Sequence, residues 1–132
     1  MKAFFPYAET TRHVTVRVAV NFLPEQSETN KSRWFWAYHI RLENEGEMAV
    51  QLISRRWEIT DGRGAMHIVE GEGVVGEQPV LKPGESYDYV SGCPLSTPSG
   101  EMVGHFTMIG EDGSHFDIHI PRFILSAPVV IG

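Results

Sequence analysis

Val14-Thr15-Val16-Arg17-Val18-Ala19-Val20-Asn21-Phe22 is predicted to form a β-strand, because its large apolar side chains recur at every second position. Successive side chains of an extended chain point to opposite faces. The four valines and Phe22 therefore share one face, while Thr15, Arg17 and Asn21 share the other. This pattern is typical of a strand that has one face in a core and one face in solvent.

Two further stretches continue this pattern. Residues 34–42 place five apolar side chains on one face: Trp34, Trp36, Tyr38, Ile40 and Leu42. Residues 50–60 begin with apolar side chains at even positions but end with them at odd positions, Trp57 and Ile59. One extra residue within a strand restores the register, so we expect a β-bulge across residues 54–56.

The rest of the chain also consists of short strand patterns separated by turns. We expect strands at residues 66–69, 87–90, 102–109 and 115–125, with a brief pairing at Val80-Leu81. Pro121 implies that the last strand lies at a sheet edge or carries a bulge. No segment of ten or more residues keeps a helical period. The chain is therefore predicted to be all-β, an antiparallel β-sandwich of about seven or eight strands.

The segment Leu81-Lys82-Pro83-Gly84-Glu85-Ser86-Tyr87 narrows the sandwich to an immunoglobulin or fibronectin type III-like one. A buried leucine, a Pro-Gly turn and a tyrosine at this spacing are typical of a chain that crosses between sheets. The Tyr87 hydroxyl would then hydrogen-bond to the backbone of the turn as a tyrosine corner. The alternative is an ordinary turn followed by a strand with an exposed tyrosine.

Size and composition indicate a single soluble domain spanning residues 1–132. The chain has a mass of 14.8 kDa and is 42% hydrophobic, with one cysteine, Cys93, that has no internal partner. No apolar run is long enough for a membrane span, and the start of the chain lacks the apolar run of a signal peptide. We therefore expect a cytoplasmic protein with a reduced thiol and no membrane insertion.

The charge distribution argues against nucleic acid as a partner. Eleven basic and seventeen acidic residues give 11 − 17 = −6. From His67 onward only Lys82 and Arg122 are basic, against nine acids. Affinity for nucleic acid comes mainly from Lys and Arg that neutralise phosphates, so we expect no nucleic-acid binding.

A glycine motif is the candidate phosphate-binding site. Gly71, Gly73 and Gly76 form the pattern G-x-G-x-x-G, which in dinucleotide-binding folds brings backbone amides and a helix N-terminus to a pyrophosphate. Here Pro79 and Pro83 oppose a following helix, and glutamates at positions 70, 72 and 77 surround the glycines. The alternative is that the glycines supply positive φ angles in a tight loop.

Histidines on the last two strands are the candidate metal site. A three-residue loop, Glu111-Asp112-Gly113, pairs Met108 with Phe116, Phe106 with Ile118 and Gly104 with Ile120, all facing inward. His105 then lies opposite His119, with Asp117 diagonal to it. Two imidazoles and a carboxylate suit Zn²⁺, Co²⁺ or Ni²⁺. The alternative is a solvated sheet face without metal, which we favour because no fourth ligand is in sight.

The sequence shows no recognisable catalytic arrangement. It does predict apolar side chains at the surface. Cys93 precedes a proline and has no dedicated base beside it. Phe35 falls on the outward face of its strand, and Phe4, Phe5 and Tyr7 lie in a terminal segment. Exposed aromatic side chains favour protein contacts. The alternative is that the N-terminal segment adds an edge strand and buries them.

The sequence resembles the ApaG family over nearly the whole chain from about Val14 onward. The likeness rests on residues 71–79 (GEGVVGEQP), Pro83-Gly84-Glu85, Ser91-Gly92, Thr97-Pro98, Gly100, Met102 and Gly104. It continues through Phe106, Met108, Gly113, Phe116, Ile120-Pro121, Phe123 and Leu125, and Arg56-Trp57 and Asp61 fit as well.

The resemblance implies a small fibronectin type III-like sandwich with no established catalytic residues. It implies a protein-interaction module, and an indirect link to cobalt tolerance and magnesium efflux. The family's glycine motif falls on Gly71, Gly73 and Gly76, which implies pyrophosphate binding. His105, His115 and His119 are not part of the family pattern.

We therefore predict a non-catalytic module that binds a protein partner and needs no cofactor. The alternative is a small-ligand sensor, which binds a pyrophosphate-containing ligand at the glycine motif or a divalent cation.

Overall fold

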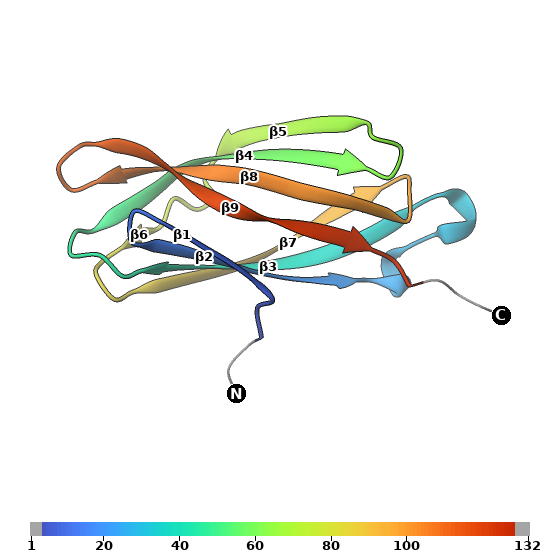
Figure 1. Ribbon diagram of the computed structural model, residues 1–132, viewed down its shortest axis with the longest axis horizontal. Coiled ribbons are helices and arrows are strands. Elements are labelled where there is room, and N and C mark those ends of the chain that lie inside the picture. Colours follow the sequence, from blue (N-terminus) through green and yellow to red (C-terminus); the bar gives the residue numbers. More distant parts are fainter. Residues whose placement is uncertain (1–3, 129–132) are drawn as a thin grey trace.

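Two antiparallel sheets face each other in a sandwich (Figure 1). The computed structural model describes residues 4–128; residues 1–3 and 129–132, the ends of the predicted 1–132 domain, lie outside the described part. The strands are β1 (Tyr7–Thr11), β2 (Val14–Phe22), β3 (Trp34–Asn44), β4 (Val50–Asp61), β5 (Met66–Glu72), β6 (Val80–Leu81), β7 (Ser86–Leu95), β8 (Ser99–Gly110) and β9 (His115–Ser126).

The predicted all-β antiparallel sandwich is confirmed. The first sheet has the order β1-β2-β3-β7, and the second has the order β5-β4-β8-β9, with β6 also paired to β4. The chain changes sheets after β3, after β6 and after β7. The described residues form nine strands rather than seven or eight, because the terminal segment forms β1 and Val80-Leu81 pairs as β6. Helical structure in residues 4–128 is confined to two 3-10 turns, Pro24–Gln26 and Thr29–Lys31, and neither could cross a bilayer.

Aromatic and branched side chains from both sheets fill the core. The predicted row of β2 is buried at Val14, Val16 and Val18, next to the β3 row from Trp36 to Leu42. The ring of Trp57 lies 5.4 Å from that of Tyr38 and 5.8 Å from that of Phe123, measured between centroids. Both layers therefore share one hydrophobic cluster.

A β-bulge lies in β4, as predicted, but slightly earlier in the chain. The register of β4 against β8 shifts between Leu52 and Ser54, which makes Ile53 the extra residue. The Ile53 carbonyl accepts hydrogen bonds from the Gly73 amide at 2.8 Å and from the Gln78 side chain at 2.9 Å. The loop after β5 thus satisfies the carbonyl that the bulge removes from the regular ladder.

The β8–β9 hairpin has the predicted register. Met108 pairs with Phe116, Phe106 with Ile118 and Gly104 with Ile120, across the turn at residues 111–113. A second register shift places Pro121 and Arg122 opposite Val103 alone, so the edge strand β9 carries the predicted bulge.

The tyrosine corner is not found. Tyr87 is half-buried against the core, and its hydroxyl makes no hydrogen bond within residues 4–128. Glu85 stabilises this turn instead: its carboxylate accepts from the Lys82 amide at 2.7 Å, and its own amide donates to the Lys82 carbonyl at 2.9 Å. A local carboxylate therefore replaces the hydroxyl that we expected.

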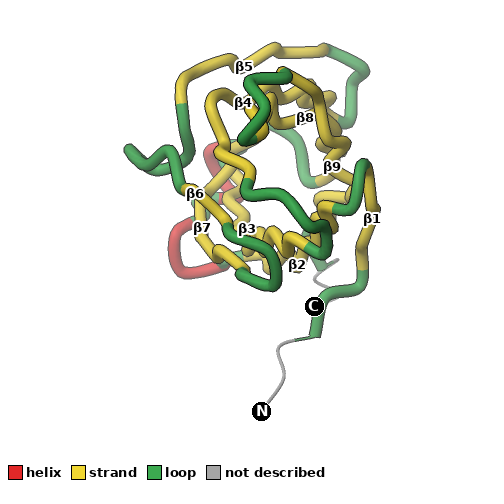
Figure 2. The backbone as a smooth tube through the Cα atoms, turned by 90° about the vertical axis from the view of Figure 1, so that its left-hand side faces the viewer, coloured by secondary structure: helices red, strands yellow, loops and turns green. Residues whose placement is uncertain are grey.

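The two long sides of the sandwich differ (Figure 2). On one side β1 joins the sheets, since the Tyr7 hydroxyl accepts from the Ile124 amide and the Thr11 hydroxyl accepts from the His119 amide. The N-terminal segment thus forms the edge strand that was the alternative, although Phe4 remains 83% exposed. On the other side, which we call the open side (β5, β6, β7 and residues 73–79), no hydrogen bond of the described residues joins β5 to β7.

Candidate functional site

The glycine motif forms a tight hairpin rather than the start of a helix. Val74 and Glu77 exchange two backbone hydrogen bonds of 2.8 and 2.9 Å. Val75 and Gly76 between them have φ values of 49° and 80°, the signs of a type I′ turn. Gly73 also has a positive φ of 64°. The positive φ angles that were the alternative for this motif are present at Gly73 and Gly76.

A close backbone approach explains Gly73, whereas the neighbour of Gly71 is a flexible arginine side chain. A Cβ on Gly73 would lie 2.3 Å from the Glu77 carbonyl oxygen, and a Cβ on Gly71 would lie 2.8 Å from the Arg55 guanidinium. Arg55 donates to the carbonyls of Glu72 and Gly73 at 3.1 and 2.8 Å. The motif therefore holds an arginine side chain of the chain itself.

The electrostatics of this loop are those of an acidic turn. The Gly73 and Val74 amides donate to the carbonyls of Ile53 and Glu77, so two amides of the motif are already used. Glutamates 70, 72 and 77 lie in the same segment. Free amides at a helix N-terminus are what an anion needs. Pyrophosphate binding at Gly71, Gly73 and Gly76 stays a prediction.

Alanine substitutions separate the structural roles of these glycines. We expect Gly73→Ala to lower the free energy of unfolding by about 2–4 kcal/mol, because it adds backbone strain and a close contact. We expect Gly76→Ala to cost about 1 kcal/mol, since its added methyl meets open space and only the positive φ is unfavourable. Urea denaturation followed by tryptophan fluorescence measures both; equal losses would contradict the steric role of Gly73.

The histidine row has the predicted register, but its side chains do not point toward a common centre. His105 lies opposite His119, and its Nε2 is 3.7 Å from the Asp117 carboxylate. Asp117 also accepts from the Thr107 hydroxyl at 2.8 Å. In residues 4–128 no three His, Cys, Asp or Glu side chains are placed to hold one metal ion. The structure brings together His105 and Asp117 only, as a partly exposed pair.

Cys93 lies in a groove of about 350 Å³ on the open side, between the sheets. Tyr38, Arg55, Trp57 and Val69 line the same groove. The thiol is almost fully buried, and burial raises the pKa of Cys93 to about 11. An activated cysteine needs a lowered pKa, so this environment disfavours a nucleophilic role.

The raised pKa of Cys93 predicts slow alkylation and a loss of stability in alkali. At pH 8 we expect reaction with iodoacetamide to be about 100-fold slower than for an unfolded control, because the thiolate fraction falls tenfold per pKa unit. Between pH 9 and 11 the unfolded thiol ionises while the folded thiol stays protonated, so stability falls by about 2 kcal/mol. A Cys93→Ala variant should lack this part of the pH dependence, and an unchanged profile in that variant would contradict the assignment.

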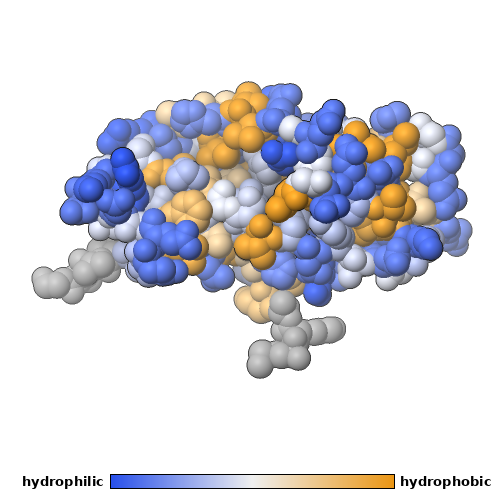
Figure 3. Space-filling model, turned by 180° about the vertical axis from the view of Figure 1, so that it is seen from behind, coloured by the Kyte–Doolittle hydropathy of each residue, from blue (hydrophilic) through white to orange (hydrophobic). Residues whose placement is uncertain are grey.

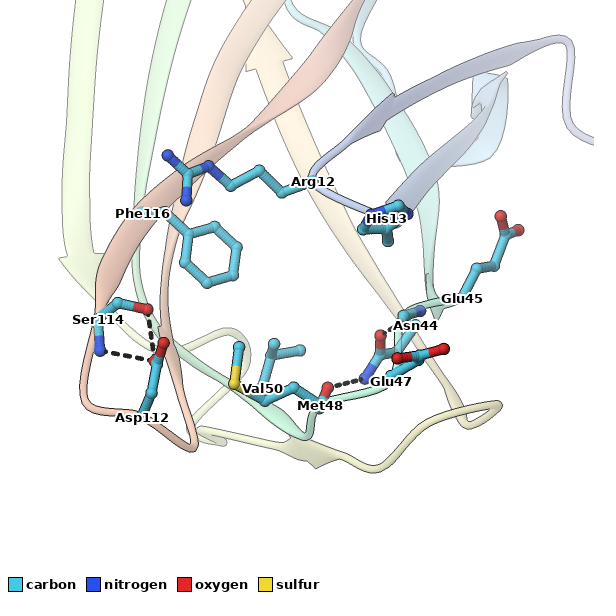
Figure 4. Close-up of a pocket in the computed structure, with 11 residues that line it drawn as sticks. Arg12, His13, Asn44, Glu45, Glu47, Met48, Val50, Asp112, Ser114 and Phe116 are labelled. Atoms are coloured by element: carbon cyan, nitrogen blue, oxygen red, sulfur yellow. Dashed lines mark hydrogen bonds between the residues drawn. The ribbon is translucent and has the colours of Figure 1, made fainter.

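A cavity of about 750 Å³ lies at one end of the sandwich, where three turns meet (Figure 4). Its lining comes from the β1–β2 turn, the β3–β4 connection and the β8–β9 turn. The walls include Met48, Val50 and Phe116, and the Arg12 guanidinium lies 5.4 Å from the centre of the Phe116 ring. Sequence reasoning missed this cavity, because its residues are far apart in the chain.

A tight hairpin turn and hydrogen bonds from Glu45 and Asn44 fix the shape of the end cavity. Arg12 and His13 both have positive φ, 48° and 67°, although neither is glycine. The His13 carbonyl accepts from the Glu45 amide at 2.8 Å, which fixes this turn against the next connection. The buried Asn44 side chain donates to the Met48 and Leu81 carbonyls at 2.9 and 3.0 Å. Positive φ at both central residues is the signature of a type I′ turn, here the two-residue hairpin that joins Thr11 to Val14.

The charge around the end cavity is mainly negative. The lining residues carry three carboxylates, those of Glu45, Glu47 and Asp112, and one guanidinium, that of Arg12. Hydrogen bonds from the Ser114 hydroxyl and amide lower the pKa of Asp112, so this carboxylate is ionised at neutral pH. The cavity suits a small, partly apolar ligand that carries positive charge.

Exposed apolar side chains gather on the open side. Eight large apolar residues of the described chain are exposed, and six of them lie between residues 66 and 90, each 41–64% exposed. The six are Met66, Ile68, Val69, Val75, Val80 and Val90. Figure 3 shows this side, with apolar side chains spread among polar ones. Several exposed apolar side chains on one side of a protein favour contact with a partner.

Comparisons with known proteins agree with the resemblance noted from the sequence. Residues 24–110 match the family described as the ApaG domain. A protein named Protein ApaG from Rhodospirillum centenum is 50% identical over 122 residues, covering 92% of this chain and 94% of the relative. Another Protein ApaG, from a Bradyrhizobium species, is 53% identical with the same coverage.

Solved structures give the same result. A crystal structure described as an ApaA protein from Bordetella pertussis is 44% identical and has a TM-score of 0.85. The match covers 89% of this chain and 95% of that chain. The C-terminal domain of wzt, 11% identical with a TM-score of 0.54 over 95% of this chain and 79% of that one, shares the fold alone.

Proposed function

We propose, because this chain belongs to the ApaG domain family, that it is a non-catalytic module that binds another protein in the cytoplasm. The observation that carries the proposal is the open side of the sandwich. Six exposed apolar side chains lie there beside two sheet edges that no described strand covers. Such surface favours contact with a partner chain.

The titratable groups support a role without catalysis. Burial raises the pKa of Tyr38, Tyr89 and Cys93, and hydrogen bonds lower the pKa of Asp112. All four shifts move the pKa away from neutrality, whereas general acids and bases are tuned toward it. Binding rather than proton transfer is the function that this pattern favours.

The link to cobalt tolerance and magnesium efflux implied by the resemblance is then indirect. The chain would act on cation levels through the protein that it binds. The His105–Asp117 pair is too small a ligand set for a closed metal site, which favours this indirect role.

Affinity capture from a bacterial lysate tests the proposal. The tagged protein is incubated with and without added Mg²⁺ and Co²⁺, and bound proteins are identified by mass spectrometry. A tagged β-sandwich of similar size and net charge serves as the control. We expect the same partner in both conditions and not with the control. A capture profile that equals the control would contradict the proposal.

The end cavity supports a second candidate, a small-ligand sensor. Its 750 Å³ volume and fixed turns suit a small molecule, and the glycine motif is the alternative location for a pyrophosphate-containing ligand. Thermal unfolding with ATP or pyrophosphate tests the glycine motif, and thermal unfolding with Mg²⁺ or Co²⁺ tests the acidic end cavity. A ligand at 100 times its Kd stabilises the fold by about 2.7 kcal/mol. If none of these four ligands changes the melting temperature, the protein is not a sensor of any of them.

A further inference from the structure

The two sides of the sandwich offer a partner very different surfaces. β1 covers one side and hydrogen-bonds to β9 through Tyr7 and Thr11. On the open side, β5 ends the five-stranded sheet and β7 ends the four-stranded sheet, and no described strand pairs with their outer edges. A partner strand therefore meets less obstruction on the open side than on the side where β1 lies against β9.

β5 is the more accessible of these two edges. It pairs with β4 along one edge, from Met66 opposite Thr60 to Glu72 opposite Ser54. Six of its seven residues are exposed. The N–H and C=O groups along the other edge of such a strand are free to pair with another chain. Added strands bind in this way through main-chain hydrogen bonds, and side chains provide specificity.

The side chains of β5 divide between two faces. His67 and Val69 line the groove between the sheets, together with Trp57 and Cys93. Met66 and Ile68 lie on the opposite face and are 57% and 51% exposed. A strand added to β5 would thus meet apolar side chains on both of its faces.

Acidic side chains follow the apolar ones along the same strand. Glu70 forms an ion pair with Arg56, and no ion pair of Glu72 is found within the described chain. From residue 67 onward the net charge is 2 − 9 = −7. A partner segment with basic residues next to Glu70 and Glu72 would therefore be favoured. A second copy of this chain, with the same acidic β5, would be disfavoured.

We infer that β5 is a strand-addition site for an extended segment of another protein that carries two basic and two apolar residues on one face. The inference rests on the proposed function. Outward-facing residues recur at every second position. The segment therefore places basic residues opposite Glu70 and Glu72 and apolar residues opposite Met66 and Ile68. A further apolar residue packs over Val69 at the groove.

Selection from a random peptide library displayed on phage tests this inference on the full chain. We expect enriched peptides in which four residues at every second position face β5. Two successive ones are Lys or Arg and the other two are apolar, and the basic pair can come first or last along the peptide. The synthetic winning peptide should shift the backbone amide signals of residues 66–72 in NMR spectra. Winning peptides without this pattern, or shifts confined to the end cavity, would overturn the inference.

Two isoleucines of nearly equal exposure, Ile68 at 51% and Ile124 at 50%, provide a matched pair of variants. Ile68→Lys places a charge on β5, and we expect it to weaken the winning peptide at least about tenfold, or about 1.4 kcal/mol. Ile124→Lys makes the same change on β9, where Ile124 is 50% exposed, and should leave the affinity unchanged. Equal losses would contradict the assignment to β5, and melting curves confirm that both variants fold.

The charge requirement has a separate test. We expect Glu72→Gln to weaken the winning peptide about threefold at low salt and not at high salt, because exposed charges are screened. An equal effect at both salt concentrations would contradict charge complementarity.

Dimerisation of the free protein through β5 would show that a second copy is the occupant and would also overturn the inference. If the Ile68→Lys variant still captures the partner from a lysate, the assignment to β5 is overturned, whereas the proposed function is not contradicted.

Discussion

Replacing Phe123 by alanine is expected to lower the free energy of unfolding by about 4 kcal/mol. Phe123 is fully buried, and its ring lies 5.8 Å from those of Tyr38 and Trp57 and 6.1 Å from that of Tyr7. These three partners come from β1, β3 and β4, so the ring joins both sheets. The substitution removes apolar contacts from both layers and leaves a cavity between them.

Urea denaturation followed by circular dichroism measures this loss. Ile124→Ala is the matched control, because it changes the next residue of β9 to alanine on the exposed face; its expected cost is about 0.5 kcal/mol. Phe123→Leu should fall between them, since most of the volume is kept. Equal losses for Phe123→Ala and Ile124→Ala would contradict the packing described here.

Gly104→Ala is expected to cost about 3 kcal/mol or more, because two strands must move apart. A Cβ on Gly104 of β8 would lie 2.0 Å from the Arg56 carbonyl oxygen of β4. That contact is backbone and cannot be relieved by a side-chain rotation. Gly104 also lies next to the register shift at Val103, where the ladder is already irregular.

Gly113→Ala is the control for this second prediction. Gly113 lies in the turn of the same hairpin, has a φ of 82°, and would meet nothing within 4 Å after addition of a Cβ. We expect a cost of about 1 kcal/mol from the positive φ alone. Thermal and urea unfolding of both variants check the difference. A Gly104→Ala variant as stable as Gly113→Ala would contradict the close approach of β4 and β8.

Hydrophobic alternation predicted most of the fold, because one face of each strand is buried. The pairing of Met108 with Phe116 followed from requiring inward-facing residues to meet across the hairpin, and the structure has that register. The bulge in β4 was predicted from a change of parity but placed a little late. Its position depends on the Gly73 amide that bonds to Ile53, a contact that spacing does not show.

Features that depend on distant segments could not be predicted. The end cavity joins Arg12, Asn44 and Phe116, which come together only after both sheets have formed. The open side depends on strand order: Met66 to Val69 were predicted as a strand, but alternation does not tell which strand forms an edge. The spacing before β7 predicted a hydrogen bond between the Tyr87 hydroxyl and the backbone of the turn. In the structure the Glu85 carboxylate accepts from the Lys82 amide of that turn instead.

The register of the histidine row was predicted from the sequence, whereas the contacts around both candidate sites were not. Gly76 lies in a tight turn with Gly73 just before it, whereas Gly71 lies in β5 beside the Arg55 side chain. His105 and His119 face each other as predicted, yet Asp117 is engaged by Thr107. Register can be predicted from a sequence, whereas the hydrogen-bond partners of a side chain require the fold.

Hydrogen exchange with a captured partner bound shows directly which face of the sandwich the partner covers. We predict that the amides of Met66–Glu72 exchange more slowly in the complex, because an added strand pairs the free edge of β5. The end cavity, including residues 12–13 and 44–48, should exchange as it does in the free protein. Protection confined to the end cavity, with β5 unchanged, would contradict the central claim that the open side of the sandwich binds the partner.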